Sequence, residues 1–346
     1  MYLDDSQHEL ILWSMLHEPG DALAHKIYEL RGVAALEDFR TGRARNLWFE
    51  LLELYAPEYL VKLPDLIERI TLRLPHLDVS SAIERGIRWG AKPMFEAQLP
   101  KAFERFRDLG SHAPYLLWVA GDERALEHNL VGVIGTRSPS ERGLRNANRV
   151  VSQIRMPVVS GGAKGIDAAA HRAALDLKLP TIAFMAGGLD RAYPMENWEL
   201  FHEMVRSGGA LVSELAPGSS PSRFRFLQRN RLIAALSEYV VVVEAGFRSG
   251  SKNTANHARL IGREVYAVAG SWGDAGPQGC NAMIKEGLAM PWGFGDQVEP
   301  TMDQKRVLDA MREGCQEPAA IAREAGLGIS QVIRELRILR LAGEIS

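Results

Sequence analysis

The chain has 346 residues, of which 46% are hydrophobic and 24% charged, and its formal net charge is −2. This composition is typical of a folded globular protein and excludes the disordered and fibrous classes. The length exceeds the roughly 100–200 residues of one ordinary domain, so we expect two or three folded units. The near-neutral charge excludes a polycation that coats nucleic acid, so any nucleic-acid site must come from a local excess of charge.

The N-terminus and the cysteines indicate the cellular compartment of the protein. The first ten residues, MYLDDSQHEL, are acidic where a signal peptide is basic, and no apolar run approaches the roughly 18 residues of a membrane span. Cys280 and Cys315 have no CxxC partner and no histidine at metal-ligand spacing. We expect a soluble cytoplasmic protein without membrane contact, metal or cofactor, whose cysteines are reduced and structural.

Most of the chain shows one of two sequence patterns, the first typical of helices alone and the second typical of alternating strands and helices. Residues 1 to about 105 are rich in Leu at helical spacing, interrupted by Pro and Gly, which predicts a small helical bundle. Short β-branched or apolar runs then alternate with amphipathic stretches, as in a parallel sheet with helices on both faces. The predicted strands are 115–119, 130–134, 157–160, 181–185, 210–213, 239–243 and 264–269. The predicted helices between them are 141–154, 166–177, 197–206, 224–236 and 254–261.

The last segment has a different pattern. It predicts helices over 304–312, 318–325 and 330–342 with a glycine-bearing turn at 326–328, typical of a helix-turn-helix or winged helix. On its last helix Arg334, Arg337 and Arg340 follow i, i+3, i+6 spacing, which suits either a DNA backbone or a solvated face. We predict an α/β fold with an extended Rossmann-like, doubly wound, mainly parallel sheet at 109–297. A helical domain at 1–108 and a winged-helix-like domain at 298–346 flank it.

Two predicted strands end in loops that suit phosphate. The first strand ends at Gly135, followed by Arg137, Ser138 and a helix whose first turn begins near Ser140. Free N–H groups at a helix N-terminus favour an anion, although a simple tight turn capped by Ser140 explains the same pattern. The second strand ends at Ser160 and is followed by Lys164 and three glycines, Gly161, Gly162 and Gly165.

These two loops match no common nucleotide motif. The GxxxxGK[ST] spacing of a P-loop and the GxGxxG of a dinucleotide fold are both absent. ATP hydrolysis and NAD chemistry are therefore disfavoured, while a nucleotide ligand stays open. Because carboxyl ends of parallel strands share one edge of a sheet, we expect both loops to border one crevice.

A third segment carries a local excess of positive charge. Residues 221–259 contain seven basic residues and two acidic ones, inside a chain of near-neutral charge. Its binding candidates are Arg223, Phe226, Arg229, Asn230 and Arg231. Phe224 and Phe226 lie among these arginines, where one ring stacked on a base and one ring buried is our preferred interpretation, with two core rings as the alternative.

A fourth loop of small residues follows the strand at 239–243 and adds Gly250, Ser251 and Lys252 to the candidates. Four converging loops with Arg or Lys, and no element suited to base edges, favour binding of a flexible phosphodiester chain without sequence preference. We expect Arg137, Lys164, Arg229 and Arg231 to contact phosphates.

Five segments then carry a family resemblance. Residues 131–143 contain GVIGTRS, 158–175 are VVSGGAKGIDAAAHRAAL, 186–197 are AGGLDRAYPMEN, 209–243 contain SELAPG and RNRLIAALS, and 279–287 are GCNAMIKEG. In this order they resemble the motif blocks of the DNA processing protein A (DprA or Smf) family, over roughly residues 115–290. Departures occur at Leu227 and Gln228, at Lys252 and Asn253, and at Ala269, and they leave the local DNA path open.

The resemblance implies a function and partners. Family members bind single-stranded DNA through an extended Rossmann domain, form homodimers and deliver the RecA recombinase onto DNA in natural transformation or repair, with no catalytic step. Accessory domains of some members resemble the helical N-terminus, of the sterile-alpha-motif or helix-hairpin kind, and the winged-helix-like tail. Contact of that tail with duplex DNA stays open.

Catalysis is the alternative class. Asp167 and His171 are four residues apart and share a helix face, but no third partner or metal cluster accompanies them, so a helix-opening Asp beside a packed His is favoured. The rival enzyme is a nucleoside-monophosphate phosphoribohydrolase, whose P-G-G-x-G-T-x-x-E run is missing here. A winged-helix regulator with an effector-binding core is disfavoured because the basic loops belong to the large domain. We therefore predict no enzyme activity.

Overall fold

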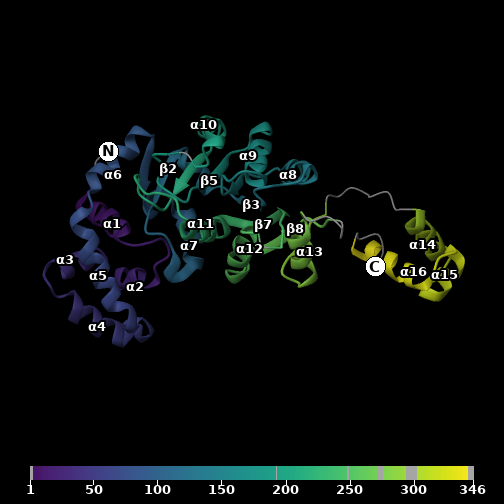
Figure 1. Cartoon of the computed structure of the whole chain (residues 1–346), viewed down its shortest axis with the longest axis horizontal. Coiled ribbons are helices and arrows are strands. Elements are labelled where there is room, and N and C mark those ends of the chain that lie inside the picture. Colours follow the sequence, from purple (N-terminus) through teal and green to yellow (C-terminus); the bar gives the residue numbers. More distant parts are fainter. Residues whose placement is uncertain (1–2, 192, 248, 271–275, 294–301, 342–346) are drawn as a thin grey trace. The chain divides into compact units, whose positions relative to one another are not determined.

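The computed structural model describes residues 3–191, 193–247, 249–270, 276–293 and 302–341 (Figure 1). The chain divides into two compact units, Met1–Trp292 and Gly293–Ser346. The division of the first unit into a helical and a sheet domain stays a prediction. Arg248 and the side chains of Arg337 and Arg340 lie outside the described residues.

Helices form the N-terminal part of the first unit. Asp4 begins the first of them with a capping box, in which its carboxylate accepts from the Gln7 N–H at 2.8 Å and the Gln7 side chain accepts from the Asp4 N–H. Buried Trp13 and Trp48 meet edge to face in the core of this part, with ring centroids 6.1 Å apart. The helices are α1 (Asp5–Leu16), α2 (Ala22–Arg31), α3 (Ala34–Arg40), α4 (Ala44–Tyr55), α5 (Leu63–Arg73) and α6 (Val79–Arg88).

A mixed sheet forms the rest of this unit. Its order in the described residues is β1-β2-β6-β5-β4-β3-β7-β8-β9; strands from β6 to β9 in this order run parallel, while β1 and β2 are antiparallel to their neighbours. The strands are β1 (Ala91–Met94), β2 (Leu117–Gly121), β3 (Leu130–Gly135), β4 (Val158–Ser160), β5 (Thr181–Phe184), β6 (Ala210–Ser213), β7 (Ser237–Glu244), β8 (Glu264–Ala267) and β9 (Met290–Pro291).

Helices cover both faces of the sheet, and Figure 1 shows the two layers. One face carries α8 (Glu141–Ile154), α9 (Ile166–Asp176) and α10 (Trp198–Arg206). The other carries α7 (Pro100–Phe106), α11 (Arg223–Leu236), α12 (Ser251–Leu260) and α13 (Gln278–Lys285). The central strands are buried on both faces, which explains their continuous runs of Val and Ile. The predicted doubly wound, mainly parallel α/β fold is confirmed.

The N-terminal helices share their core with one end of the sheet. A single apolar cluster joins Trp13 and Trp48 to Trp118 of β2, Ala183 of β5 and Phe201 of α10. Arg73 Nη1 also donates to the Leu16 carbonyl oxygen at 3.0 Å, and His112 Nδ1 lies 2.8 Å from the Gly20 carbonyl oxygen. Packing therefore holds these helices against the sheet as one compact unit.

Three short elements were not predicted. β1 falls in the stretch expected to be helical, while β9 and α13 fall where no element was expected. β1 has four residues, AKPM, and lies at the sheet edge, where Pro93 is tolerated because no further strand needs its missing N–H. The four residues of β1 and the two of β9 give too short a pattern for an alternation to be recognised, and the eight residues of α13 make only about two helical turns.

The second unit contains α14 (Met302–Arg312), α15 (Pro318–Ala325) and α16 (Ile329–Leu341), at positions close to those predicted. α15 ends at Gly326 in the left-handed conformation, which turns the chain toward α16. Val307, Ile321, Val332 and Leu339 pack between the three helices. The three predicted helices and the glycine turn are thus present. The winged-helix-like identity of this unit stays a prediction, and a wing, which would follow residue 341, lies outside the described residues.

Two further findings concern the predictions about membrane spans and about the cysteines. In the described parts of the chain, no helix is long and apolar enough to cross a membrane. Cys280 and Cys315 are both free, and burial raises the pKa of the Cys280 thiol to about 12. Cys280 is therefore a protonated core residue, as predicted for a structural thiol.

Trp118 provides a test of the shared core. Because its side chain is fully buried between the sheet and the N-terminal helices, Trp118→Ala should lower the free energy of unfolding by about 3–5 kcal/mol, measured by urea denaturation. Trp89, which is 48% exposed, is the matched control, and Trp89→Ala should cost roughly 1 kcal/mol or less. Equal losses in the two variants would contradict the shared core.

Candidate nucleic-acid interface

A cleft of about 730 Å³ opens at the carboxyl edge of the parallel strands. It lies where the strand order reverses, because the chain continues from β3 to β4 on one side of β3 and returns to β7 on the other. Ligands of open α/β sheets bind at this switch point. The lining residues come from the loops after β3, β4, β5 and β7 and from α11 and α12: Ile134, Gly135, Thr136, Arg137, Ala163, Asp167, Tyr193, Arg223, Phe226, Leu227, Arg229, Asn230, Ile233, Gly246, Ser249, Gly250, Ser251 and Thr254.

Backbone hydrogen bonds through Thr136 join three of these strand ends. The Thr136 N–H donates to the Glu244 carbonyl oxygen at the end of β7, at 2.7 Å, and the Thr136 carbonyl oxygen accepts from the Ile166 N–H at 3.1 Å. Gly165 precedes Ile166 with φ +84°, and a Cβ there would lie 2.4 Å from the Thr136 carbonyl oxygen. Glycine is therefore required at 165 to bring the β4 loop against the β3 loop.

Arg229 joins the ends of β4 and β5 from below the cleft. Its Nη1 donates to the Gly161 carbonyl oxygen at 2.7 Å and to the Phe184 carbonyl oxygen. Burial lowers the pKa of Arg229 to about 10, so the guanidinium stays charged at neutral pH. Asp167, also buried, is close enough to favour that charge, and burial raises the pKa of its own carboxyl group. Arg229 thus places positive charge beneath the cleft.

Aromatic rings and guanidinium groups meet at the cleft wall. Arg137 Cζ lies 5.0 Å from the centroid of the Phe226 ring, and Arg229 Cζ lies 5.8 Å from it. The Tyr193 ring lies 5.4 Å from the Phe226 ring at an angle of 50° and is 48% exposed. The lining contains three guanidinium groups, those of Arg137, Arg223 and Arg229, and one carboxylate, that of Asp167. The wall is therefore positively charged and offers two rings for stacking.

The structure brings eight predicted site residues together around this cleft. They are Gly135, Arg137, Arg223, Phe226, Arg229, Asn230, Gly250 and Ser251. They come from three of the four predicted loops, while the β4 loop contributes Ala163, which was not predicted. The first turn of α12 opens onto the cleft through Gly250, Ser251 and Thr254. Phe224 is 50% exposed and Phe226 is half-buried, so neither ring is a core residue.

Other predicted residues support the loops. Ser140 caps α8, and its N–H and Oγ donate to the Glu244 carboxylate at 3.0 and 2.6 Å, so a carboxylate already occupies the helix end predicted to receive a phosphate. Ser160 Oγ donates to the Val133 carbonyl oxygen at 2.6 Å. The carbonyl oxygens of Gly161 and Gly162 accept from Arg229 and from Asn197 Nδ2. These residues shape the site from inside.

The remaining predicted cations lie apart from the lining. Exposed Lys164 pairs with Glu196 at 2.5 Å on the β4 loop, beside Ala163 of the cleft. Lys252 Nζ lies 4.7 Å from the centroid of the exposed Phe247 ring, and exposed Ser138 follows Arg137. Arg231 is 2% exposed, and its Nη2 donates to Glu214 at 2.8 Å. The structure thus turns Arg231 toward the protein interior.

Sequence reasoning missed Tyr193, Thr136 and Phe247 as candidates. Tyr193 belongs to the loop after β5, and its only sequence signal was the Y-P pair of the AGGLDRAYPMEN segment. Thr136 lies next to the predicted residues Gly135 and Arg137. It joins the loops through its backbone N–H and carbonyl oxygen, and the identity of a side chain does not reveal such backbone contacts.

The best enzyme candidate forms no catalytic pair. The Thr181 hydroxyl donates to the Val158 carbonyl oxygen at 3.1 Å, so His171 Nδ1, 2.7 Å from the same hydroxyl oxygen, acts as the donor to it. Burial lowers the pKa of His171 to about 3. Within the described ranges, no group of His, Cys, Asp and Glu could hold a metal ion. His171 is therefore a neutral packed histidine, as favoured from the sequence.

The fold and the cleft define a class: Rossmann-like proteins with anion-compatible loops at a switch point. Residues 93–301 match the model of the family described as DNA recombination-mediator protein A. DNA processing protein DprA of Streptococcus pneumoniae is 38% identical over 210 residues, which are 56% of this chain and 74% of that protein. The chain therefore belongs to the DNA recombination-mediator protein A family.

Two solved structures are similar to this chain as well. The X-ray structure of DNA processing protein A from Streptococcus pneumoniae superposes with a TM-score of 0.62 at 28% identity, over 84% of this chain and 95% of that one. DNA processing protein A from Helicobacter pylori, studied for its single-stranded DNA binding mode, superposes with a TM-score of 0.51 at 29% identity. That match covers 58% of this chain and 90% of the other.

The contact between the β3 and β4 loops predicts a strict glycine requirement. Gly165→Ala forces a side chain into the left-handed region and against the Thr136 carbonyl oxygen, so we expect a loss of about 2 kcal/mol or more in the free energy of unfolding. Gly250→Ala is the control, because Gly250 has φ −64° and a Cβ added there would meet no atom within 4 Å, and it should change stability by less than about 0.5 kcal/mol. Similar stability of both variants in urea denaturation would refute the close approach.

The buried His171 predicts a dependence of stability on pH. Its pKa is about 3 in the folded state and near its ordinary value of 6.5 when unfolded, so the unfolded state binds the extra proton below pH 6.5. The stability is present above that pH and falls by about 1.4 kcal/mol per pH unit below it. Between pH 7 and 5 the wild type should therefore lose about 2 kcal/mol more than His171→Gln. Parallel losses in urea denaturation would show that His171 is not buried and neutral.

Proposed function

We propose that the cleft binds single-stranded DNA by its phosphodiester backbone, without sequence preference. The observation that carries this proposal is the convergence of guanidinium groups, small-residue loops and two aromatic rings at one switch point. A flexible strand needs a backbone-tracking basic groove and stacking surfaces, and any base offers a ring face for stacking. Among the described lining residues, no helix or strand presents a row of polar side chains suited to base edges.

Charge supports the phosphate contacts. Arg137 and Arg223 are exposed at the rim, while buried Arg229 adds a fixed positive charge beneath the backbone groups of the loops. The first turn of α12 adds N–H groups and the positive end of a helix dipole. Among the described residues neither Arg137 nor Arg223 forms a salt bridge, so both guanidinium groups are expected to contact phosphates.

Stacking supports binding of unpaired bases. Phe226 and Tyr193 form a tilted pair on the wall, and Tyr193 leaves nearly half of its surface exposed. Base stacking on such rings contributes about 1–3 kcal/mol per base. A duplex keeps its bases stacked on each other, so this pair favours a single strand.

Family membership supports the biological role. The family is described as a recombination mediator, and the Helicobacter pylori relative was studied for single-stranded DNA binding. We therefore propose that the protein acts in the cytoplasm as a homodimer that helps to load RecA onto bound strands, in transformation or repair, and that it catalyses no reaction. The three helices of the second unit are a candidate contact for duplex DNA.

The double variant Arg137→Ala with Lys164→Ala tests the cleft. Removing the Arg137 contact at the rim and the exposed charge of Lys164 on the neighbouring β4 loop should weaken binding to oligothymidylate about tenfold or more. It should also reduce the slope of log K against log salt by about 0.7–1.4, since each phosphate contact contributes about 0.7 on a single strand. Fluorescence anisotropy at several salt concentrations measures both quantities.

Arg259→Ala is the matched control for this variant, because Arg259 is an exposed arginine on α12 that does not line the cleft. It should leave both the affinity and the salt slope unchanged. An unchanged slope in the double variant would overturn the proposal. Release of the free base and ribose 5-phosphate from a nucleoside monophosphate by the wild type would instead support the phosphoribohydrolase alternative.

A further inference from the structure

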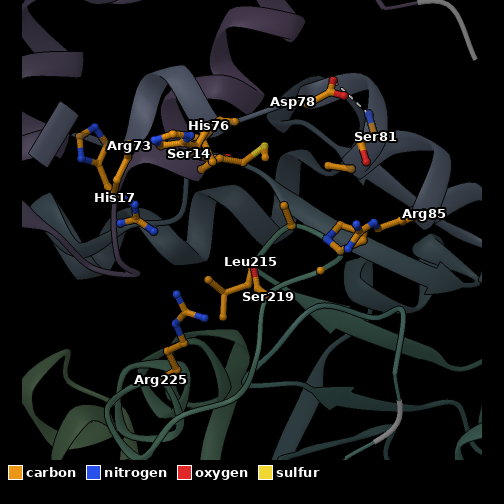
Figure 2. A pocket seen from close by; sticks show the side chains of 16 residues that line it. Ser14, His17, Arg73, His76, Asp78, Ser81, Arg85, Leu215, Ser219 and Arg225 are labelled. Carbon is orange, nitrogen blue, oxygen red and sulfur yellow. Dashed lines mark hydrogen bonds between the residues drawn. The ribbon is translucent and has the colours of Figure 1, made fainter. Parts of the chain in front are cut away.

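A second, smaller pocket lies between the N-terminal helices and the loop after β6. Its volume is about 330 Å³, and Figure 2 shows Arg225 reaching it from α11 on one side and Arg85 from α6 on another. The lining residues are Ser14, Met15, His17, Arg73, His76, Leu77, Asp78, Ser81, Ala82, Arg85, Leu215, Ala216, Pro217, Gly218, Ser219 and Arg225.

Positive charge exceeds negative charge around this pocket. Three guanidinium groups, of Arg73, Arg85 and Arg225, line it together with one carboxylate, Asp78, whose Oδ1 accepts from the Ser81 N–H at 3.2 Å. Glu18, just outside the lining, accepts from Arg225 at 2.8 and 2.9 Å and lies 3.6 Å from Arg73. Arg85 forms no salt bridge within the part of the chain that the structure describes, so its charge is available to a ligand.

His17 supplies an independent observation. Its side chain is 3% exposed, it lines the pocket, and neither ring nitrogen has a hydrogen-bond partner among the described residues. Burial, with the charges of Arg69 and Arg73, holds the pKa of His17 well below its ordinary value. Because buried polar groups are nearly always hydrogen-bonded in native proteins, the unpartnered imidazole of His17 is a candidate hydrogen-bond donor to an occupant of this pocket.

The combination favours a phosphate group as that occupant. Guanidinium groups bind phosphate oxygens with charge-assisted hydrogen bonds, and a neutral imidazole donates one more. The pocket exceeds the size of a phosphate alone and falls at the lower end of pockets that hold small ligands. It is separated from the DNA cleft by the first turn of α11, where Arg223 faces the cleft and Arg225 faces this pocket.

We propose that this pocket binds the phosphate group of a nucleotide, which is either a free mononucleotide or the terminal nucleotide of a DNA strand. Arg85 and Arg73 supply the charge, and His17 donates a hydrogen bond to a phosphate oxygen. Binding of a free nucleotide here does not rest on the proposed function of the cleft.

Thermal unfolding of the full-length protein with inorganic phosphate, thymidine monophosphate or thymidine tests the site. Phosphate and the monophosphate should raise Tm by about 2–4 °C at saturating concentration, and thymidine should not. Arg85→Ala should weaken the binding of both about tenfold, and His17→Phe should do the same while keeping an aromatic ring against Trp13.

Two controls make the test specific. Arg88→Ala removes an exposed arginine one turn further along α6, outside the pocket, and should leave the shift intact. The cleft variant Arg137→Ala with Lys164→Ala should also keep it. The proposal is overturned if phosphate gives no shift in the wild type, if Arg85→Ala keeps the full shift, or if only the cleft variant loses it. Because Arg85 is exposed, its replacement remains informative even where His17→Phe fails to fold.

Oligothymidylates distinguish the two sources of phosphate. If the site holds a strand terminus, a 5′- or 3′-phosphorylated oligothymidylate should bind the wild type at least about threefold more tightly than the unphosphorylated strand, and Arg85→Ala should abolish the difference. If it holds a free nucleotide, thymidine monophosphate binds while terminal phosphates make no difference. If thymidine monophosphate does not bind and a terminal phosphate makes no difference, the proposal is overturned. Loss of oligothymidylate binding in the cleft variant tests the proposed function of the cleft and does not bear on this pocket.

Discussion

The cleft depends on the buried guanidinium of Arg229. This side chain accounts for the joining of α11 to the strand ends, because one nitrogen donates to the carbonyl oxygen of Gly161, just after β4, and to that of Phe184, the last residue of β5. A buried charge is stable only when hydrogen bonds and an opposite charge compensate for lost hydration, and here backbone carbonyls and nearby Asp167 do so. The same charge that orders the loops therefore also makes the cleft attractive to anions.

α11 distributes its arginines among different tasks. Arg223 faces the cleft, Arg225 pairs with Glu18 of the N-terminal helices, Arg229 lies under the loops, and Arg231 pairs with Glu214. A helix turns by about 100° per residue, so closely spaced arginines point in different directions. One helix thus links the cleft, the second pocket and the N-terminal helices, since its side chains line both cavities.

The polar groups of the cleft suit binding better than proton transfer. His171 bonds to Thr181 and is neutral, and Asp167 is buried next to a permanent cation. A general acid or base needs a pKa near the working pH and access to a substrate proton. His171 has neither, because its pKa is about 3 and it does not line the cleft. The exposed groups at the rim are guanidinium groups and rings, which bind without titrating.

The sequence by itself determined the parallel α/β fold, the loops and eight of the eighteen lining residues, because strand runs, glycine turns and arginines are local signals: β6, α8 and Arg137 lie where they were predicted. Tertiary structure alone decided which arginine reaches the cleft, since Arg229 and Arg231 differ by two residues but face different partners. It also placed the Glu244 carboxylate at the end of α8 and gathered Arg85 and Arg225 around His17. Such contacts join residues distant in the chain, and no local pattern encodes them.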